Sequence, residues 1–212
     1  ATDGGAFKYD VPMNQWSSLN GTLNITQINS VALDPTSPDV AYIGAQDNGT
    51  DKFTGSLSWS QKRQNNGGTT LVDFTTPTTV YHEYDYSFGS SFIQRSGDSG
   101  STWSSKTSGI STTDDSNFYP ALAMDPATST RLIAGTNRVY LSPNRGDSWA
   151  AISTTNTNGW TTAEPIDALT IAKTSASTIY ASAGGNIFVT TNTGSTWTAR
   201  NPVASPSTAL DF

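Results

Sequence analysis

The tryptophans of this chain recur at a nearly constant interval, and that interval limits the folds that the chain can adopt. Five of the six are separated by 43, 44, 46 and 48 residues, namely Trp16, Trp59, Trp103, Trp149 and Trp197. A repeat of about 45 residues is the length of a four-stranded blade in a β-propeller. The spacing therefore predicts an all-β chain built from repeated four-stranded antiparallel sheets.

The residues before three of these tryptophans share the frame [ST]-x-[DN]-x-G-x-[ST]-W, at 96–103, 142–149 and 190–197. The Asp or Asn is expected to accept backbone N–H bonds inside a tight turn, and the Gly to supply a positive φ. The Trp is expected to bury a large aromatic surface between blades. We therefore assign nine residues to structure and not to chemistry: Asp98, Gly100, Trp103, Asn144, Gly146, Trp149, Asn192, Gly194 and Trp197.

A second pattern recurs in phase with the tryptophans, an apolar strand followed by an Asp/Pro turn and another strand. It begins at Val31, Leu122 and Leu169. Together the two patterns divide a single propeller domain, residues 1–212, into repeats at 1–27, 28–70, 71–120, 121–165 and 166–212. Four repeats contain all four strands. The fifth blade is divided between the termini, with its third and fourth strands at 5–9 and 16–19 and a first strand at 209–212.

Two arrangements of the divided blade are consistent with the sequence. The termini can close a five-bladed ring through a three-stranded blade. Alternatively, the chain is an arc of a larger propeller, which a partner chain completes. An open arc leaves long unpaired strand edges, which natural proteins avoid.

Composition excludes several classes of partner. The net charge of −6 argues against nucleic acid, since phosphate binding needs clustered Lys and Arg. No apolar run approaches the roughly 18 residues of a membrane span. With no Cys and His82 as the single His, we expect no catalytic metal site and no organic cofactor. Asp114, Asp115 and Asn117 leave a structural Ca²⁺ open, although their spacing fits no known loop motif.

Function is expected on the face formed by two sets of loops. One set joins the second strand of each blade to the third, and the other joins the fourth strand to the next blade. Polar and aromatic residues converge there, as in a binding site. The candidates for ligand binding are Asp47, Asn48, Tyr84, Asp85, Tyr86, Arg138 and Trp160. Trp160 has two interpretations: an exposed ring that stacks on a sugar, or a ring that packs the linker onto its blade.

The sequence resembles bacterial secreted propellers with BNR or Asp-box repeats, the sialidase- and xyloglucanase-like group. The resemblance rests on the framed turns and on segments 2–5, 43–50 and 135–140, and it implies a secreted β-propeller. Sialidases also need an arginine triad and an R-I-P-like segment, which this chain lacks. The segment 2–10 is similar to the T-D-x-G-G-A-Y-R-W-D segment of two-propeller xyloglucanases. That similarity implies a catalytic base at Asp3, but in that family the acid comes from a second propeller.

Three functions follow as hypotheses. We favour a non-catalytic extracellular binding or scaffold propeller whose ligand is a polysaccharide or glycan. One alternative is a glycoside hydrolase that uses Asp3 with Asp47 or Asp85, because glycosidic cleavage needs two carboxyl groups across one bond. The other alternative is a protein-binding propeller.

Overall fold

The structure is a computed structural model that describes residues 7–19, 26–86 and 91–200. These residues form four four-stranded sheets and one two-stranded hairpin. No helix among them is long and apolar enough to cross a membrane. In chain order the strands are β1 Phe7–Asp10, β2 Gln15–Ser18, β3 Ile28–Leu33, β4 Val40–Ala45, β5 Gly49–Thr54, β6 Ser60–Arg63, β7 Thr70–Val72, β8 Val80–Glu83, β9 Ile93–Ser96, β10 Ser104–Ser105, β11 Ala121–Met124, β12 Leu132–Gly135, β13 Val139–Ser142, β14 Ala150–Ala151, β15 Ile166–Ala172, β16 Ser175–Ala183, β17 Asn186–Thr190 and β18 Thr198–Ala199.

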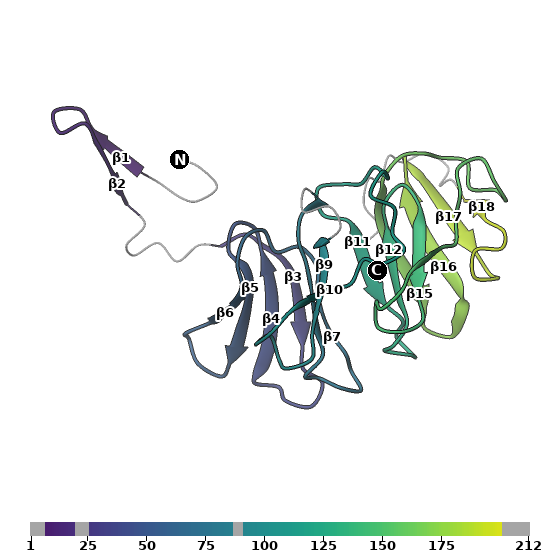
Figure 1. The fold of residues 1–212 in the computed structure, drawn as a ribbon, viewed down its shortest axis with the longest axis horizontal. Coiled ribbons are helices and arrows are strands. Elements are labelled where there is room, and N and C mark those ends of the chain that lie inside the picture. The colour runs from purple at the N-terminus through teal and green to yellow at the C-terminus, as the bar shows by residue number, and fades with distance from the viewer. Residues whose placement is uncertain (1–6, 20–25, 87–90, 201–212) are drawn as a thin grey trace.

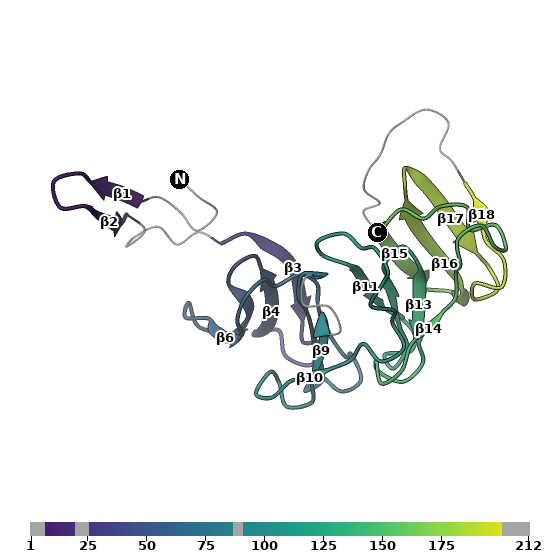
Figure 2. The ribbon, with the colours of Figure 1, turned by 45° about the horizontal axis from the view of Figure 1, so that its top comes forward.

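Each four-stranded sheet is an antiparallel meander, because its strands lie side by side in chain order. We call β3–β6, β7–β10, β11–β14 and β15–β18 the first to fourth sheets. They follow one another along an arc, with the first and fourth sheets at its ends (Figure 1, Figure 2). The leading strands of neighbouring sheets touch, β3 with β7 and β11 with β15. This is the blade arrangement of a β-propeller, as the repeat predicted, and the described residues form an open arc.

The hairpin β1–β2 supplies the two N-terminal strands that the sequence predicted. Tyr9 pairs with Trp16 across it, and their rings lie 4.9 Å apart. In Figure 1 the hairpin stands away from the first sheet. The strand predicted at 209–212 lies outside the described residues.

Two apolar clusters join the later sheets. One connects the second and third sheets through residues such as Tyr81, Ile93 and Leu132. The other connects the third and fourth sheets through residues such as Ile133 and Phe188. Burying each such side chain stabilises the fold by about 1.5–3 kcal/mol.

In the first three sheets, an aspartate closes the turn between the first and second strands. Asp73 Oδ1 accepts the N–H of Thr75 at 2.9 Å, and Asp125 Oδ1 accepts that of Ala127 at 2.8 Å. Asp34 makes the same bond in the first sheet. This local geometry explains the repeated Asp after an apolar strand.

The framed turn at 96–103 is held by a network centred on Asp98. Its Oδ1 accepts the N–H groups of Ser101 at 3.0 Å and Thr102 at 2.8 Å, while Oδ2 accepts the Thr102 hydroxyl at 2.6 Å. The Ser96 hydroxyl donates to Asp98 Oδ1 and accepts the N–H of Gly100. Gly100 has a φ of 86°, which a residue with a Cβ rarely adopts.

The two later framed turns repeat this geometry with asparagine. Asn144 Oδ1 accepts the N–H of Ser148 at 3.0 Å, and Asn192 Oδ1 accepts that of Thr196 at 2.9 Å. Asn144 Nδ2 also donates to the hydroxyl of Ser148, and Asn192 Nδ2 donates to the hydroxyl of Thr196. The glycines four positions after the first Ser or Thr of the frame, Gly146 and Gly194, have φ values of 81° and 83°.

Each framed tryptophan makes the same contact with the preceding sheet. Its indole Nε1 donates to a backbone carbonyl three residues beyond the tryptophan of the previous repeat. The pairs are Trp103 to Lys62 at 3.1 Å, Trp149 to Lys106 at 2.7 Å and Trp197 to Ile152 at 3.0 Å. The tryptophan period is therefore a period of contacts between sheets.

Candidate ligand-binding face

The connections between second and third strands lie at one end of the sheets, and the framed turns lie at the other. Antiparallel strands require this, because successive connections in a meander alternate between its two ends. Six of the predicted ligand residues lie in or next to connections at the first of these ends: Asp47, Asn48, Tyr84, Asp85, Tyr86 and Arg138. Asp3 lies outside the described residues.

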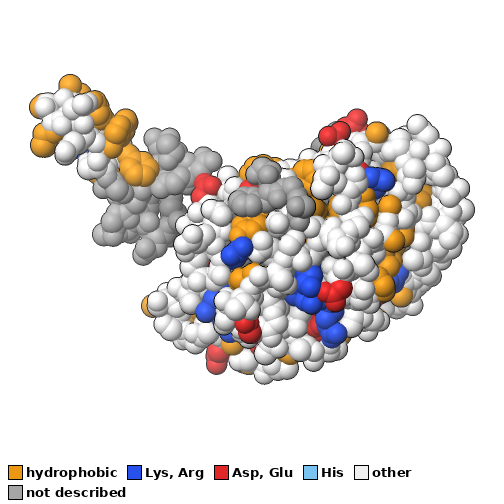
Figure 3. All heavy atoms as spheres, viewed as in Figure 1, with side chains coloured by type: hydrophobic (Ala, Val, Ile, Leu, Met, Phe, Trp, Pro, Cys, Tyr) orange, Lys and Arg blue, Asp and Glu red, His pale blue; other side chains and the backbone are white. Residues whose placement is uncertain are grey.

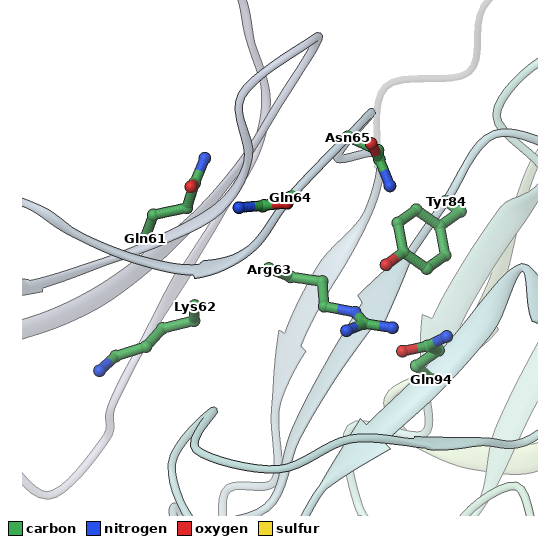
Figure 4. Close-up of a pocket in the computed structure, with 7 residues that line it drawn as sticks. All are labelled: Gln61, Lys62, Arg63, Gln64, Asn65, Tyr84 and Gln94. Carbon is green, nitrogen blue, oxygen red and sulfur yellow. The ribbon is translucent and has the colours of Figure 1, made fainter.

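A pocket of about 460 Å³ opens between the first and second sheets. Strand β6 and the residues after it form one wall, while Tyr84 and Gln94 of the second sheet form the other (Figure 4). Its lining residues are Gln61, Lys62, Arg63, Gln64, Asn65, Tyr84 and Gln94. The lining contains carboxamides, two cations and one phenol, but no carboxylate.

Three side chains of this pocket point toward one another in Figure 4: Arg63, Tyr84 and Gln94. The Arg63 guanidinium carbon lies 5.4 Å from the centroid of the Tyr84 ring. Arg63 Nε and Gln94 Oε1 are buried and have no hydrogen-bond partner in the protein. A buried polar atom left unpaired costs about 1–3 kcal/mol. One donor and one acceptor in the wall of the pocket are thus unpaired. Neither atom is exposed, so a ligand can complete their pairing once the Arg63 and Gln94 side chains turn toward it.

The charge of the pocket comes from Lys62 and Arg63. His82, which pairs with Gln94 across strands β8 and β9, does not add to it. Burial and the nearby Arg63 charge lower the pKa of His82 to about 3, so its ring is neutral at pH 7. Its Nδ1 lies 2.5 Å from the hydroxyl of Thr50. A positive pocket therefore occurs on a chain whose net charge is −6.

Beside this pocket, the side chain of Asn66 bridges two of the predicted acids, Asp47 and Asp85. Asn66 Nδ2 donates to Asp85 Oδ2 at 2.9 Å, and Asn66 Oδ1 accepts the backbone N–H of Asp47 at 3.0 Å. Asp47 and Asn48 are exposed on the β4–β5 turn, whereas Asp85 is buried. Of the two described acids in the hydrolase hypothesis, only Asp47 is therefore open to a substrate.

Glu83 is a buried acid next to Tyr84 that was not among the predicted ligand residues. One carboxyl oxygen accepts the N–H of Thr69 at 2.8 Å, and the other has no partner in the protein. Burial raises the pKa of Glu83 to about 8, against the opposing hydrogen bond from Thr69. Glu83 is thus mainly protonated at pH 7. Its side chain has no exposed surface, so it does not reach a ligand directly.

Tyr86 and Arg138 belong to a separate network between the second and third sheets, centred on Asp114. Asp114 accepts both Nε and Nη2 of Arg138, the hydroxyl of Tyr140 at 2.6 Å and the hydroxyl of Thr136 at 2.8 Å. Tyr86 donates its hydroxyl to the backbone carbonyl of Asp114. Burial would raise the pKa of Asp114, but these bonds outweigh it and lower the pKa. Arg138 is therefore already paired with a carboxylate.

Two of the residues considered for a structural Ca²⁺, Asp114 and Asn117, form hydrogen bonds within the protein. Asp114 directs its oxygens at Arg138 and hydroxyl groups, while Asn117 donates to the carbonyl of Ile166. Within 7–19, 26–86 and 91–200, no three acidic or histidine side chains gather where they could hold a metal ion.

Trp160 requires a correction to the sugar-stacking interpretation. Its side chain is 0% exposed, and its ring lies 4.5 Å from that of Phe188 and 5.1 Å from that of Trp197. The linker folds inward at this point because Asn158 and Gly159 adopt positive φ, and the Trp197 N–H donates to the Asn158 carbonyl. Trp160 is a core residue and has no free face for a ligand.

Sequence reasoning missed Arg63, Asn66 and Gln94. The sequence did contain a signal for the first two. Residues 61–66 are an unbroken run of amide and basic residues shortly after Trp59, whose preceding residues do not keep the frame. Gln94 carried no such signal. It joins the pocket only because the first and second sheets pack together, which brings Gln94 close to Arg63, 31 residues earlier in the sequence.

No protein-family profile and no curated protein matches the chain. Solved structures match its fold. A GH74 enzyme from Niastella koreensis has a TM-score of 0.61 at 18% identity, over 93% of this chain and 34% of the other. An extracellular domain from B. thetaiotaomicron, described as part of a hybrid two-component system, has a TM-score of 0.64 at 14% identity, over 96% and 26%. YCF48 from Cyanidioschyzon merolae has a TM-score of 0.57 at 14% identity, over 85% and 57%.

The chain spans about a quarter to a third of the first two matched chains. At these identities the likeness shows the β-propeller fold.

Proposed function

We propose that this chain is a non-catalytic, extracellular β-propeller that binds a glycan in the pocket between its first and second sheets. The proposal rests on two unpaired polar atoms of that pocket, the donor Arg63 Nε and the acceptor Gln94 Oε1. Both belong to residues that line the pocket together with Tyr84. Sugar hydroxyls both donate and accept hydrogen bonds, so one saccharide unit can satisfy both atoms. The volume of about 460 Å³ lies within the range of small-ligand pockets.

The charge of the pocket narrows the ligand class to acidic glycans. Lys62 and Arg63 line it without a carboxylate, and an arginine fork matches a carboxylate or sulfate group. A uronic acid or a sulfated sugar therefore fits this lining better than a neutral glucan does. The net charge of −6 over the whole chain disfavours binding of polyanions elsewhere on its surface.

The fold neighbours are consistent with this proposal. They include enzymes named GH74, one of them described as a xyloglucanase from Xanthomonas campestris, and an extracellular domain. We extend three further features to this chain on the same basis: secretion, the Asp-box identity of the three framed turns, and completion of the arc by its own termini or by a partner chain.

A glycan array followed by calorimetry tests the proposal. Wild type should bind one or more acidic glycans, and Arg63→Met should weaken binding about 10- to 100-fold, the loss of a charge-assisted hydrogen bond. Arg200→Met, at an exposed arginine in the fourth sheet, is the matched control and should bind normally. Absence of binding to every glycan, or equal affinity of all three proteins, would refute the pocket assignment.

The hydrolase alternative has its own test. Asp3→Ala and Asp47→Asn should each abolish release of reducing ends from β-glucans if the chain is a glycoside hydrolase. If wild type and both variants show the same background rate, the hydrolase alternative is refuted.

A further inference from the structure

The face of the first sheet that points away from the second sheet is open along β3 and around Trp59, although Ile43 and Ala41 at its centre are buried. Tyr42 and Thr50 mark the covered face, since they contact Ser99 and His82 of the second sheet. Neighbouring residues of a strand point to opposite faces, so Ile43 points the other way. Val31 pairs with Ile43, and Leu33 pairs with Ala41, which places both on the open face.

The exposed side chains on this face are apolar, and the equivalent apolar side chains in the later sheets are buried. Val31 is 61% exposed, whereas Leu122, at the same position of the third sheet, is 8% exposed. Leu33 is 66% exposed, against 3% for Ile171 in the fourth sheet. Trp59 and Leu57 extend the open surface and line a recess of about 660 Å³. A preceding sheet covers Leu122 and Ile171, whereas no sheet of the described residues covers Val31 or Leu33.

The N-terminal hairpin has the matching character. Hydrophobic side chains gather on it in the space-filling view (Figure 3). Its large apolar residues are all exposed, including Phe7, Trp16 and Leu19. It carries the third and fourth strands of the preceding repeat, and its tryptophan keeps the period.

We propose that β1–β2 docks on the open face of the first sheet as the outer half of a preceding blade, with Trp59 Nε1 donating to the Leu19 carbonyl. The three described sheet junctions set this register. In each, the tryptophan donates to the carbonyl three residues beyond the previous tryptophan. Three residues beyond Trp16 is Leu19.

The connecting chain is long enough for this docking. Leu19 and Ile28 are nine positions apart, and Lys62 and Thr70 are eight apart. The second connection already joins two docked sheets. The hairpin β1–β2 of the same chain can therefore reach the open face, and no second molecule is needed to cover it.

A disulfide tests the register, because the natural chain has no cysteine. A Cβ built on Gly100 would lie 3.0 Å from the Lys62 Cβ, and the corresponding pair at the open face is Ser56 and Leu19. Disulfides need Cβ atoms about 3.5–4.5 Å apart, so a pair at this position can bridge after the turn moves outward by about 0.5 Å. The double variant Leu19→Cys, Ser56→Cys should thus close an intramolecular bond on mild oxidation, seen by intact mass and peptide mapping.

The matched control is Leu19→Cys with Ser101→Cys, which places the second cysteine on the exposed turn one sheet further along. It should remain reduced under the same conditions. Adding Leu33→Asp to the first pair should slow its closure, since a charge would enter the docking face. Equal closure of both pairs, no closure in a folded protein, or covalent dimers in place of the internal bond would overturn the proposal. It does not depend on the glycan assignment, because its readout needs no ligand.

Discussion

Arg145 in the framed turn of the third sheet forms an ion pair with Asp73, 72 residues earlier in the second sheet. Arg145 Nε lies 2.9 Å from Asp73 Oδ2, and the Asp73 side chain is fully buried. Asp73 also holds its own turn through Thr75, so one carboxylate serves both a local turn and a sheet junction.

Arg145→Met should destabilise the protein by about 1–3 kcal/mol, because a hydrogen bond to a buried charge is lost. The comparison is urea unfolding against Arg200→Met, whose side chain is exposed at the far end of the fourth sheet. Equal midpoints for the two variants would mean that the pair contributes nothing.

The same pair predicts acid sensitivity. Burial alone would raise the pKa of Asp73, but the hydrogen bonds from Ser129, Arg145 and Thr75 outweigh it and hold the pKa below its ordinary range. A lowered folded pKa stabilises the protein above the unfolded value near 4, and this stabilisation disappears as pH falls below it. In Arg145→Met the loss of stability on acidification should be smaller than in wild type.

Glu83 predicts the opposite dependence. Burial raises its pKa to about 8, so the folded state keeps a proton that the unfolded state releases above a pH of about 4.5. Stability from this group should therefore decline as pH rises from about 4.5 to 8. Glu83→Gln should flatten that decline, since its amide oxygen can still accept the Thr69 N–H. Glu164→Gln, at an exposed position, should keep the wild-type profile when unfolding is measured across this range.

Asp98 should tolerate asparagine but not alanine. Asn144 and Asn192 already make the equivalent backbone bonds, so Asp98→Asn should retain near-native thermal stability at pH 7. Asp98→Ala should lower the melting temperature, because the N–H groups of Ser101 and Thr102 lose their acceptor. Identical melting temperatures for the two variants would contradict this role.

The variants should also differ in acid. Hydrogen bonds from Thr102, first its hydroxyl and then its N–H, lower the pKa of Asp98 to about 2. The stabilisation is present above a pH of about 4 and disappears as pH falls toward 2. Between pH 4 and pH 2 the melting temperature of wild type should therefore fall more than that of Asp98→Asn, which has no carboxyl group to protonate at this position.

Trp160→Ala should cost about 3–5 kcal/mol of stability, as expected for a buried aromatic ring. Its effect on glycan binding, measured below its unfolding transition, should be small. Full stability together with lost binding would restore Trp160 as a ligand residue and contradict its burial against Phe188 and Trp197.

The fold was predictable because its signals are local. An aspartate that closes its own turn, as Asp73 and Asp98 do, needs only residues two to four positions away. A tryptophan after such a turn then marks each repeat. These features gave the four-stranded sheets and the end of the sheets at which Asp47, Tyr84 and Asp85 lie.

The chemistry of the site was decided by contacts between sheets. Arg138 looked free in sequence, but Asp114, 24 residues away, pairs with it. Trp160 had two interpretations in sequence, and positive φ at Asn158 and Gly159 turns it into the core. Arg63 and Gln94 become a pocket only because two sheets meet there. The sequence by itself determined the repeat and its turns, because these depend on short-range hydrogen bonds. Only the tertiary structure decided which polar groups stay unpaired, because that depends on which side chains reach across each junction.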